Sequence, residues 1–193
     1  VVAIGSSTGG PPALSTIIPQ LSPDLPSTVV ISQHMPTGFT RTFAERLNKL
    51  SRLRVKEAEN GDVVSKGEVL IAPGGYHLSF KKQGKRVITR LIDRRKDDRY
   101  TPSVDAMFTS AADMWGNRTL GVVLTGMGSD GKEGVLKIKD RGGYVLAESE
   151  ETCVVFGMPK VAISTGQVDE VLPLYNIGQR INEGCKYGFT KRS

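Results

Sequence analysis

The stretch VVAIGSSTGGPPAL, residues 1–14, decides the fold of this chain. Residues 1–5 are an apolar run rich in β-branched side chains, which predicts a buried strand. A turn of glycine, serine and threonine follows at 5–10, and the pattern beyond it predicts a helix over 12–21. A strand that is apolar throughout and leads directly into a helix is typical of a parallel sheet covered by helices on both faces.

The same alternation continues along the rest of the chain, and its order predicts an α/β fold. We expect a doubly wound, mostly parallel sheet with helices on both faces. The exception is 78–92, where two runs flank Gln83 and Gly84 and predict an antiparallel hairpin insertion at the edge or rim of the sheet. The further strands are predicted at 28–32, near Val55, and at 69–72, 120–124, 144–147 and 170–172, and the further helices at 41–50, 102–115, 132–140, 159–164 and from about Leu174.

Length and composition favour a single domain spanning 1–193. A chain of 193 residues with 38% hydrophobic and 24% charged residues is ordinary for a globular protein, which excludes the disordered and fibrous classes. Its longest apolar runs, such as 120–124, are far shorter than the roughly 18 residues that span a bilayer, so we expect a cytoplasmic protein without direct membrane insertion. The chain opens without methionine inside a predicted strand, so we expect it to be part of a longer protein.

The titratable residues exclude some kinds of site. Two cysteines without close spacing, Cys153 and Cys185, give neither a disulfide framework nor a metal site, and two histidines exclude a histidine-rich metal centre. The net charge of +6 is concentrated in 81–99 and 186–192, where few aromatic side chains are available to stack on bases. Composition alone leaves a carboxylate metal site open. The site that we expect nevertheless uses no metal and no cofactor, and we expect no nucleic-acid partner. The basic residues are interpreted as a solvated face or as a surface that meets an acidic protein partner.

The loop after the first strand carries the strongest candidate for a nucleophile. Residues 5–9 match the G-x-S-x-G spacing centred on Ser7, in the strand-to-helix context that this spacing requires. Glycines on both sides allow a tight turn that exposes the hydroxyl, and a helix beginning near Pro12 aims free N–H groups at the same place. The same residues suit a loop that cradles a phosphate or caps a helix, so this loop alone leaves both interpretations open.

A candidate base follows the second strand. His34 leaves the strand directly after the Ser7 unit, and consecutive strands are usually neighbours, so this side chain is expected to reach the serine hydroxyl. A lone histidine is more often structural than catalytic. His77, at the start of the predicted hairpin, is the weaker candidate for the same role.

A third loop, after the strand at 120–124, holds Asp130 in a glycine-rich turn ahead of a helix. A carboxylate there is placed to orient a histidine ring. Two alternatives remain at this stage. In the first, Asp130 caps the following helix. In the second, the glycines of 126–131 form a dinucleotide-binding fingerprint, and Glu148 or Glu150 binds the ribose. The nucleotide interpretation is disfavoured because Asp130 places a negative charge beside the pyrophosphate.

Several segments together closely resemble the catalytic domain of the bacterial chemotaxis protein-glutamate methylesterase family. The resemblance covers nearly the whole chain, and its combination of segments is far more specific than any one of them. It is weaker over 78–92 and over the basic stretch that follows. The segments are 4–10, 33–40, 71–74, 99–105, 124–131 and 153–159.

The resemblance implies a serine hydrolase that demethylates glutamate methyl esters on chemoreceptor helices and also deamidates glutamines. It implies Ser7 as nucleophile, His34 as general base and Asp130 as its orienting carboxylate. It further implies that the Met127 N–H helps to bind the oxyanion and that Thr8 supports the site. It also implies two partners, which are the methylated cytoplasmic helices of chemoreceptors and an N-terminal receiver domain, phosphorylated by a histidine kinase, in the full-length protein. The rival hypotheses are a dinucleotide-binding oxidoreductase and a non-catalytic receptor-binding module.

Overall fold

The centre of the structure is a parallel sheet of seven strands. The computed structural model describes residues 1–189, and within them the strands lie in the order β3-β4-β2-β1-β7-β8-β9, with every neighbouring pair parallel. The chain builds outward from β1 to one side and then returns to its other side with β7. This confirms the predicted doubly wound sheet. The strands are β1 (Val2–Ser6), β2 (Val29–Gln33), β3 (Arg54–Glu57), β4 (Glu68–Ile71), β7 (Leu120–Val123), β8 (Tyr144–Glu148) and β9 (Glu170–Leu172).

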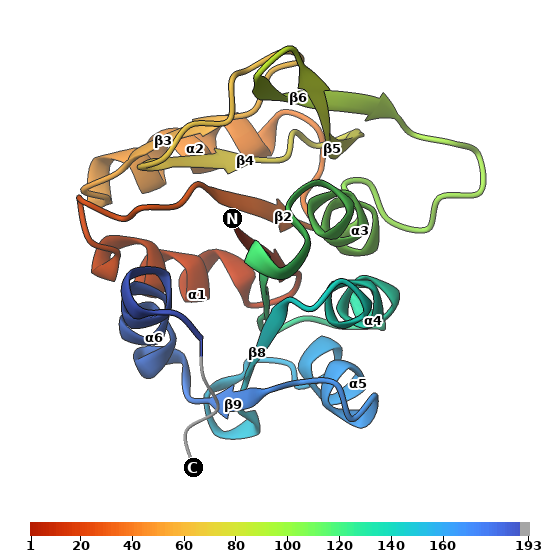
Figure 1. The fold of residues 1–193 in the computed structure, drawn as a ribbon. Helices are drawn as coiled ribbons and strands as arrows, with labels where there is room; N and C mark the ends of the chain where they lie inside the picture. Colours follow the sequence, from red (N-terminus) through yellow and green to blue (C-terminus); the bar gives the residue numbers. More distant parts are fainter. Residues whose placement is uncertain (190–193) are drawn as a thin grey trace.

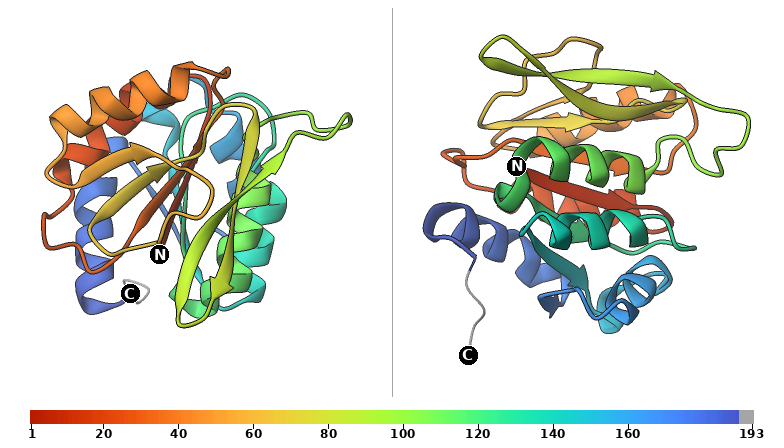
Figure 2. Two further views of the ribbon diagram at one scale, coloured as in Figure 1. Left: turned by 90° about the horizontal axis from the view of Figure 1, so that it is seen from above. Right: turned by 45° about the vertical axis from the view of Figure 1, so that its right-hand side comes forward.

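Helices cover both faces of this sheet (Figures 1 and 2). Val2 and Ile4 of β1 belong to the core beneath α1, α2 and α6, whereas Ala3 belongs to the core beneath α3, α4 and α5. Both sides of β1 are therefore buried, which is why the strand shows no polar alternation. The helices are α1 (Gly10–Ile17), α2 (Phe39–Leu50), α3 (Val104–Trp115), α4 (Lys132–Asp140), α5 (Met158–Ser164) and α6 (Leu174–Tyr187), with short 3-10 turns at Ile18–Gln20, Gly116–Arg118 and Glu150–Thr152.

The predicted hairpin is present as β5 (Tyr76–Gln83) and β6 (Arg86–Asp93), but it does not extend the main sheet. It forms a separate two-stranded sheet that packs on α3. The Phe80 N–H donates to Ser110 Oγ at 2.8 Å, and the Phe80 and Trp115 rings meet edge to face at 4.9 Å. Of the two predicted places, the rim is therefore the one that the hairpin takes, and it adds no strand to the sheet edge. Figure 1 shows the hairpin beside the β3–β4 end of the molecule.

Two helix starts differ from the prediction for local reasons. Helix α1 begins at Gly10 rather than Pro12, because Gly9 takes a φ of 83° that turns the chain and two prolines then fit the first helical turn. Helix α3 begins at Val104 rather than Pro102, because the Ser103 side chain caps it by accepting from the Ala106 N–H.

Among residues 1–189, no helix has the length and apolar character needed to cross a membrane. The end of the second basic cluster, 190–192, lies outside the described residues.

Candidate active site

Ser7 lies at the carboxyl end of β1, the central strand of the sheet. Its N–H donates to the carbonyl of Thr125 at 3.1 Å, and its own carbonyl accepts from the Gly10 N–H and from Gln33 Nε2, both at 2.9 Å. Since Gln33 ends the neighbouring strand β2, the Ser7 turn is anchored to the strands on both sides of β1. The Ser7 side chain is half-buried, so its hydroxyl is held in place yet accessible.

His34 leaves the carboxyl end of β2 and reaches Ser7, as predicted. Its backbone N–H donates to the Ser6 carbonyl at 3.0 Å, which fixes the residue beside the Ser7 turn. Nδ1 lies 3.1 Å from Ser7 Oγ, and Nε2 lies 2.7 Å from Asp130 Oδ2. A carboxylate that accepts from Nε2–H selects the tautomer whose Nδ1 lone pair faces the serine hydroxyl. Only 10% of the His34 side chain is exposed.

Asp130 does not cap the helix that follows it, which was one of the alternatives. Gly131, with a φ of 105°, precedes α4, and the Asp130 carboxylate instead binds the N-terminus of α3. Oδ1 accepts from Ser103 Oγ at 3.0 Å and from the Asp105 N–H at 2.9 Å, and Oδ2 accepts from the Val104 N–H at 2.7 Å. These are the free N–H groups at the start of a helix, where negative charge is favoured.

The electrostatics keep Asp130 ionised. Burial acts to raise the pKa of this carboxyl, but the hydrogen bonds from His34 and from the Asp105 and Val104 N–H groups outweigh burial, and its pKa is lowered overall. An ionised, fixed carboxylate is what the orientation of a histidine ring requires.

Met127 and Thr8 frame the other side of Ser7. The Met127 side chain is 71% exposed, and its N–H donates no hydrogen bond within residues 1–189, so the amide is available to a ligand. Gly126 brings this peptide close, because a Cβ there would lie only 2.8 Å from Ser7 Cβ. The Thr8 side chain is exposed, while its carbonyl accepts from Thr125 Oγ1 at 2.9 Å. Thr8 thus contributes to the site through its backbone.

The dinucleotide interpretation of 126–131 does not fit this geometry. Glu148, proposed for a ribose, is fully buried, and its carboxylate accepts from the Thr125 N–H at 2.8 Å and from Thr152 Oγ1 at 3.0 Å. Gly128, the glycine of the fingerprint whose backbone a pyrophosphate would approach, is covered by Tyr100, whose Oη would lie 2.7 Å from a Cβ placed there. Glu148 is therefore a structural anchor of the β7 loop.

His77 lies apart from Ser7 and has partners of its own. Its Nε2 lies 2.8 Å from Asp98 Oδ2, and its Nδ1 accepts from the Ser103 N–H at 3.1 Å. The ring ties the hairpin to the segment that leads into α3.

The sequence prediction missed Tyr100 as part of the site. Its ring stacks on the His34 imidazole with centroids 4.3 Å apart and planes 8° from parallel. Tyr100 lies in an irregular connection between β6 and α3, where no periodicity reports which way a side chain faces. The one available signal was its place in the segment 99–105, which carries part of the family resemblance.

Replacement of Glu148 is expected to disturb the β7 loop. Glu148→Leu leaves the buried Thr125 N–H without an acceptor, which costs about 1–3 kcal/mol of unfolding free energy. Because Thr125 also holds Ser7 and Thr8, we expect about tenfold slower ester hydrolysis. Glu148→Gln keeps an acceptor oxygen and should show a much smaller loss in both urea unfolding and turnover. Equal effects of the two variants would contradict this role.

Asp105 predicts a specific pH dependence of stability. Burial, together with the charge of nearby Asp130, raises its pKa from 3.8 to about 6. The folded chain thus takes up a proton between about pH 4 and 6, so the stabilisation from protonated Asp105 is present below pH 4 and is lost as the pH rises through 6.

Asp105→Asn mimics the protonated form, and its Oδ1 still accepts from the Gly134 N–H. The variant should be more stable than the wild type by about 1–2 kcal/mol at pH 8, with solvent screening included, and equally stable at pH 4. Urea unfolding at the two pH values measures this. A gain of the same size at both would refute the assignment to Asp105.

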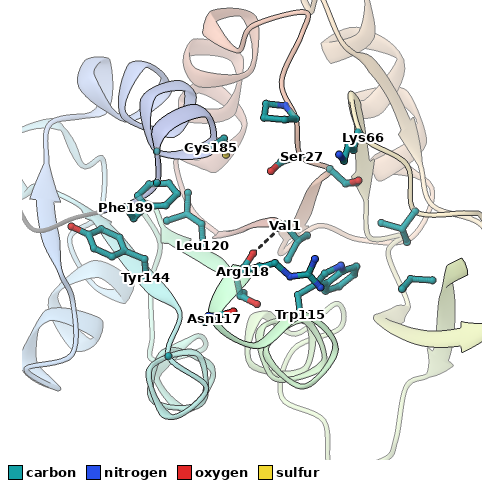
Figure 3. A pocket seen from close by; sticks show the side chains of 18 of the residues that line it. Val1, Ser27, Lys66, Trp115, Asn117, Arg118, Leu120, Tyr144, Cys185 and Phe189 are labelled. Carbon is teal, nitrogen blue, oxygen red and sulfur yellow. Dashed lines mark hydrogen bonds between the residues drawn. The ribbon is translucent and has the colours of Figure 1, made fainter. Parts of the chain in front are cut away.

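A hollow lies at the opposite end of the sheet from Ser7. A cavity of about 730 Å³ is lined by residues at the amino ends of the strands, among them Val1, Leu120 and Tyr144 (Figure 3). None of the predicted site residues lines it. Parallel α/β sheets bind ligands at the carboxyl ends of their strands, where Ser7, His34 and Asp130 converge, so we place the candidate active site there.

Known proteins resemble this chain over nearly its whole length. The family model described as CheB methylesterase matches residues 2–181. The chain is 58% identical over 185 residues to the Geobacter sulfurreducens "Protein-glutamate methylesterase/protein-glutamine glutaminase 3", covering 96% of this chain and 50% of that protein. It is 48% identical to an Archaeoglobus fulgidus protein whose name differs only in lacking the final number, covering 93% of this chain and 52% of that one.

A solved structure gives the same result for the fold. The chain aligns with the crystal structure of the Thermotoga maritima CheB methylesterase catalytic domain with a TM-score of 0.92 and 49% identity, over 94% of this chain and 96% of that one. The chain spans about half the length of the curated relatives it matches. With a family model over nearly its full length and the same fold, this chain belongs to the CheB methylesterase family.

Proposed function

We propose that this chain hydrolyses methyl esters of glutamate side chains in proteins, with methanol as the second product, and that it deamidates glutamine side chains with release of ammonia. The names of its relatives state these two activities for them. The observation that carries the proposal is the hydrogen-bonded series Ser7–His34–Asp130 across the carboxyl ends of three adjacent strands.

In the proposed reaction Ser7 Oγ attacks the ester carbonyl while His34 Nδ1 takes its proton. The imidazolium that forms keeps its Nε2–H on Asp130, which stabilises the new charge. The imidazolium then protonates the departing methoxide, and methanol leaves an acyl-serine. A water molecule, deprotonated by His34, attacks that acyl group and releases the glutamate carboxylate and the Ser7 hydroxyl.

The tetrahedral oxyanion is assigned to the N–H of Met127. The first turn of α1 offers no free donor, contrary to the prediction, because the Gly10 N–H donates to the Ser7 carbonyl, residues 11 and 12 are prolines, and the Ala13 N–H donates to the Gly9 carbonyl. The Met127 amide has no internal acceptor among residues 1–189 and lies beside Ser7. Removing one donor of this kind typically costs about 10²–10³-fold in rate, so the peptide position matters as much as the triad geometry.

We propose the methylated helices of chemoreceptors in the cytoplasm as the substrate. In the full-length protein we propose regulation by an N-terminal receiver domain that a histidine kinase phosphorylates. Family membership supports both, and the coverage of only half of each relative is consistent with a further domain.

The test is incubation of a methylated receptor fragment with the wild type and with Ser7→Ala, followed by mass spectrometry. A loss of 14 Da per site, the difference between a methyl ester and a carboxyl, is expected with the wild type alone. Ser164→Ala is the control and should hydrolyse the esters like the wild type, because Ser164 Oγ is exposed and donates to the Val161 carbonyl within α5. Wild-type protein that leaves every ester intact would refute the proposed function.

A further inference from the structure

We propose that residues 94–99, here named the basic loop, form the docking surface for an acidic segment of the protein substrate beside the reacting glutamyl group. This inference rests on the proposed function and adds the chemistry by which a protein substrate is recognised. The basic loop belongs to the positively charged stretch of the sequence that the catalytic mechanism leaves without a role.

The cations of the basic loop are free to meet a partner. Arg94, Arg95, Lys96 and Arg99 are all exposed, and none of their side chains forms an ion pair within residues 1–189. Elsewhere in the chain, Lys56, Lys139 and Arg180 bind carboxylates of their own. The basic loop therefore presents uncompensated positive charge.

The carboxylates of the basic loop do not cancel this charge. Asp98 faces inward, where its Oδ2 lies 2.8 Å from His77 Nε2 and accepts from the Arg95 N–H at 2.6 Å. Asp98 thereby shapes the turn and fixes it to the hairpin. Only Asp97 remains as an exposed acid, and the six residues carry a net charge of +2.

The basic loop is joined directly to the active site. Tyr100, the next residue, stacks on His34, and the Arg99 guanidinium lies 5.6 Å from the centroid of the Tyr100 ring. Figures 1 and 2 show the connection between β6 and α3 projecting beyond the body of the molecule, on the side toward which β1 points. A protein segment that delivers a side chain to Ser7 passes close to these cations.

The other side of Ser7 is apolar and equally exposed. Met127 is 71% and Val154 68% exposed, and Val154 lies directly against Gly9 of the Ser7 turn. Exposed apolar side chains beside a charged patch are typical of a surface that a macromolecule covers. A small ester would need neither feature.

The partner follows from the chemistry of the reaction. A protein segment that carries esterified glutamates also carries a carboxylate at each glutamate that is not esterified. Every hydrolysis or deamidation adds one more carboxylate, so the segment is acidic. A cationic surface beside the nucleophile attracts such a segment and raises its association rate, and salt weakens this attraction.

Two matched triple variants test the proposal. Arg94→Ser/Arg95→Ser/Lys96→Ser alters the basic loop, and Lys81→Ser/Lys82→Ser/Lys85→Ser removes the same charge from exposed positions of the hairpin. Each lowers the net charge from +6 to +3. Lys85 lines the cavity at the amino ends of the strands, far from the carboxyl ends where Ser7 lies. Both sets are also made in a Ser7→Ala background to measure binding of a fluorescent receptor fragment without turnover.

For the basic-loop variant we expect about tenfold weaker binding at low salt. We also expect kcat/KM for the receptor ester to fall about tenfold relative to kcat/KM for p-nitrophenyl acetate. This fall should come from a higher KM for the receptor ester. Binding by the wild type should weaken with NaCl, and this dependence should flatten in the basic-loop variant alone. The hairpin variant should stay within about twofold of the wild type.

Equal behaviour of the two triple variants would overturn the docking surface even if the wild type is an active methylesterase. A wild type that hydrolyses p-nitrophenyl acetate but no receptor ester would instead refute the proposed function, and the binding comparison would still test the surface. A DNA oligonucleotide is the third ligand. If it binds the wild type as strongly as the receptor fragment does, and loses as much affinity in the basic-loop variant, the assignment to a protein partner would be overturned.

Discussion

Replacement of His34 by glutamine is expected to reduce ester hydrolysis by about 10³-fold or more. His34 Nδ1 is the one ring atom within hydrogen-bond distance of Ser7 Oγ, and a neutral amide does not accept the serine proton during attack. Methanol release from a methylated receptor fragment measures the loss. Labelling of Ser7 by a fluorophosphonate should fall in parallel, because that reaction needs the same activated hydroxyl.

The chain offers a closely matched control in His77→Gln. The chain has only two histidines, and each has an aspartate oxygen within 2.8 Å of its Nε2. His77 is 7% exposed and holds the hairpin, so its loss should lower unfolding stability while activity stays within about tenfold of the wild type. A His34→Gln variant with more than a tenth of wild-type turnover would exclude His34 as the base.

The positions of Ser7, His34 and Asp130 were predictable because parallel sheets collect the ends of their strands at one edge. Each of these residues lies in the loop that follows an apolar run, and runs of that kind are visible without any structure. The structure brings the three together along β2, β1 and β7, which are neighbours in the sheet. The sequence pattern did not reveal what holds Asp130 in place. Backbone N–H groups of α3 hold its carboxylate, and such donors leave no mark in the sequence because every residue type except proline carries an N–H.

Two further features depended on contacts that spacing does not report. Glu148 matched the distance of a ribose-binding acid, yet its carboxylate turns inward to the Thr125 N–H. A fingerprint fixes separations along the chain, whereas burial decides which way a side chain faces. Tyr100 approaches His34 from an irregular segment, and the hairpin forms a sheet of its own because α3, rather than a strand edge, offers it an apolar surface.

The orientation of the His34 ring connects the fold with the chemistry. Nδ1 faces Ser7 Oγ and Nε2 faces the Asp130 carboxylate, so this carboxylate lies on the far side of the ring from the backbone of β2. Helix α3 holds the carboxylate in this position, because its N-terminus reaches the end of β7 and fixes Asp130 there. Gly5 permits the approach, since a Cβ on this residue would lie 2.2 Å from Val104 Cγ1. The packing of α3 on β1 is thus part of the construction of the site.

Asp130→Asn is expected to lower ester hydrolysis by about 10²–10⁴-fold while Ser7 and His34 remain in place. Asp130 Oδ2 accepts from His34 and from the Val104 N–H, and Oδ1 accepts from Ser103 Oγ and the Asp105 N–H. In either orientation the asparagine NH₂ therefore faces a backbone N–H. If it also faces His34, it favours the tautomer that carries hydrogen on Nδ1, which then has no lone pair for the serine proton.

The variant should also lose stability, since one donor at the start of α3 is left unpaired at a cost of about 1–3 kcal/mol. Asp98→Asn is the matched control, because Asp98 Oδ2 likewise faces a histidine Nε2 and accepts a backbone N–H. Its turnover of p-nitrophenyl acetate should stay within about tenfold of the wild type. Comparing the two variants by kcat and by urea unfolding separates the effect on the His34 tautomer from the general cost of an unpaired donor. Equal losses of kcat in both would show that Asp130 acts only through stability.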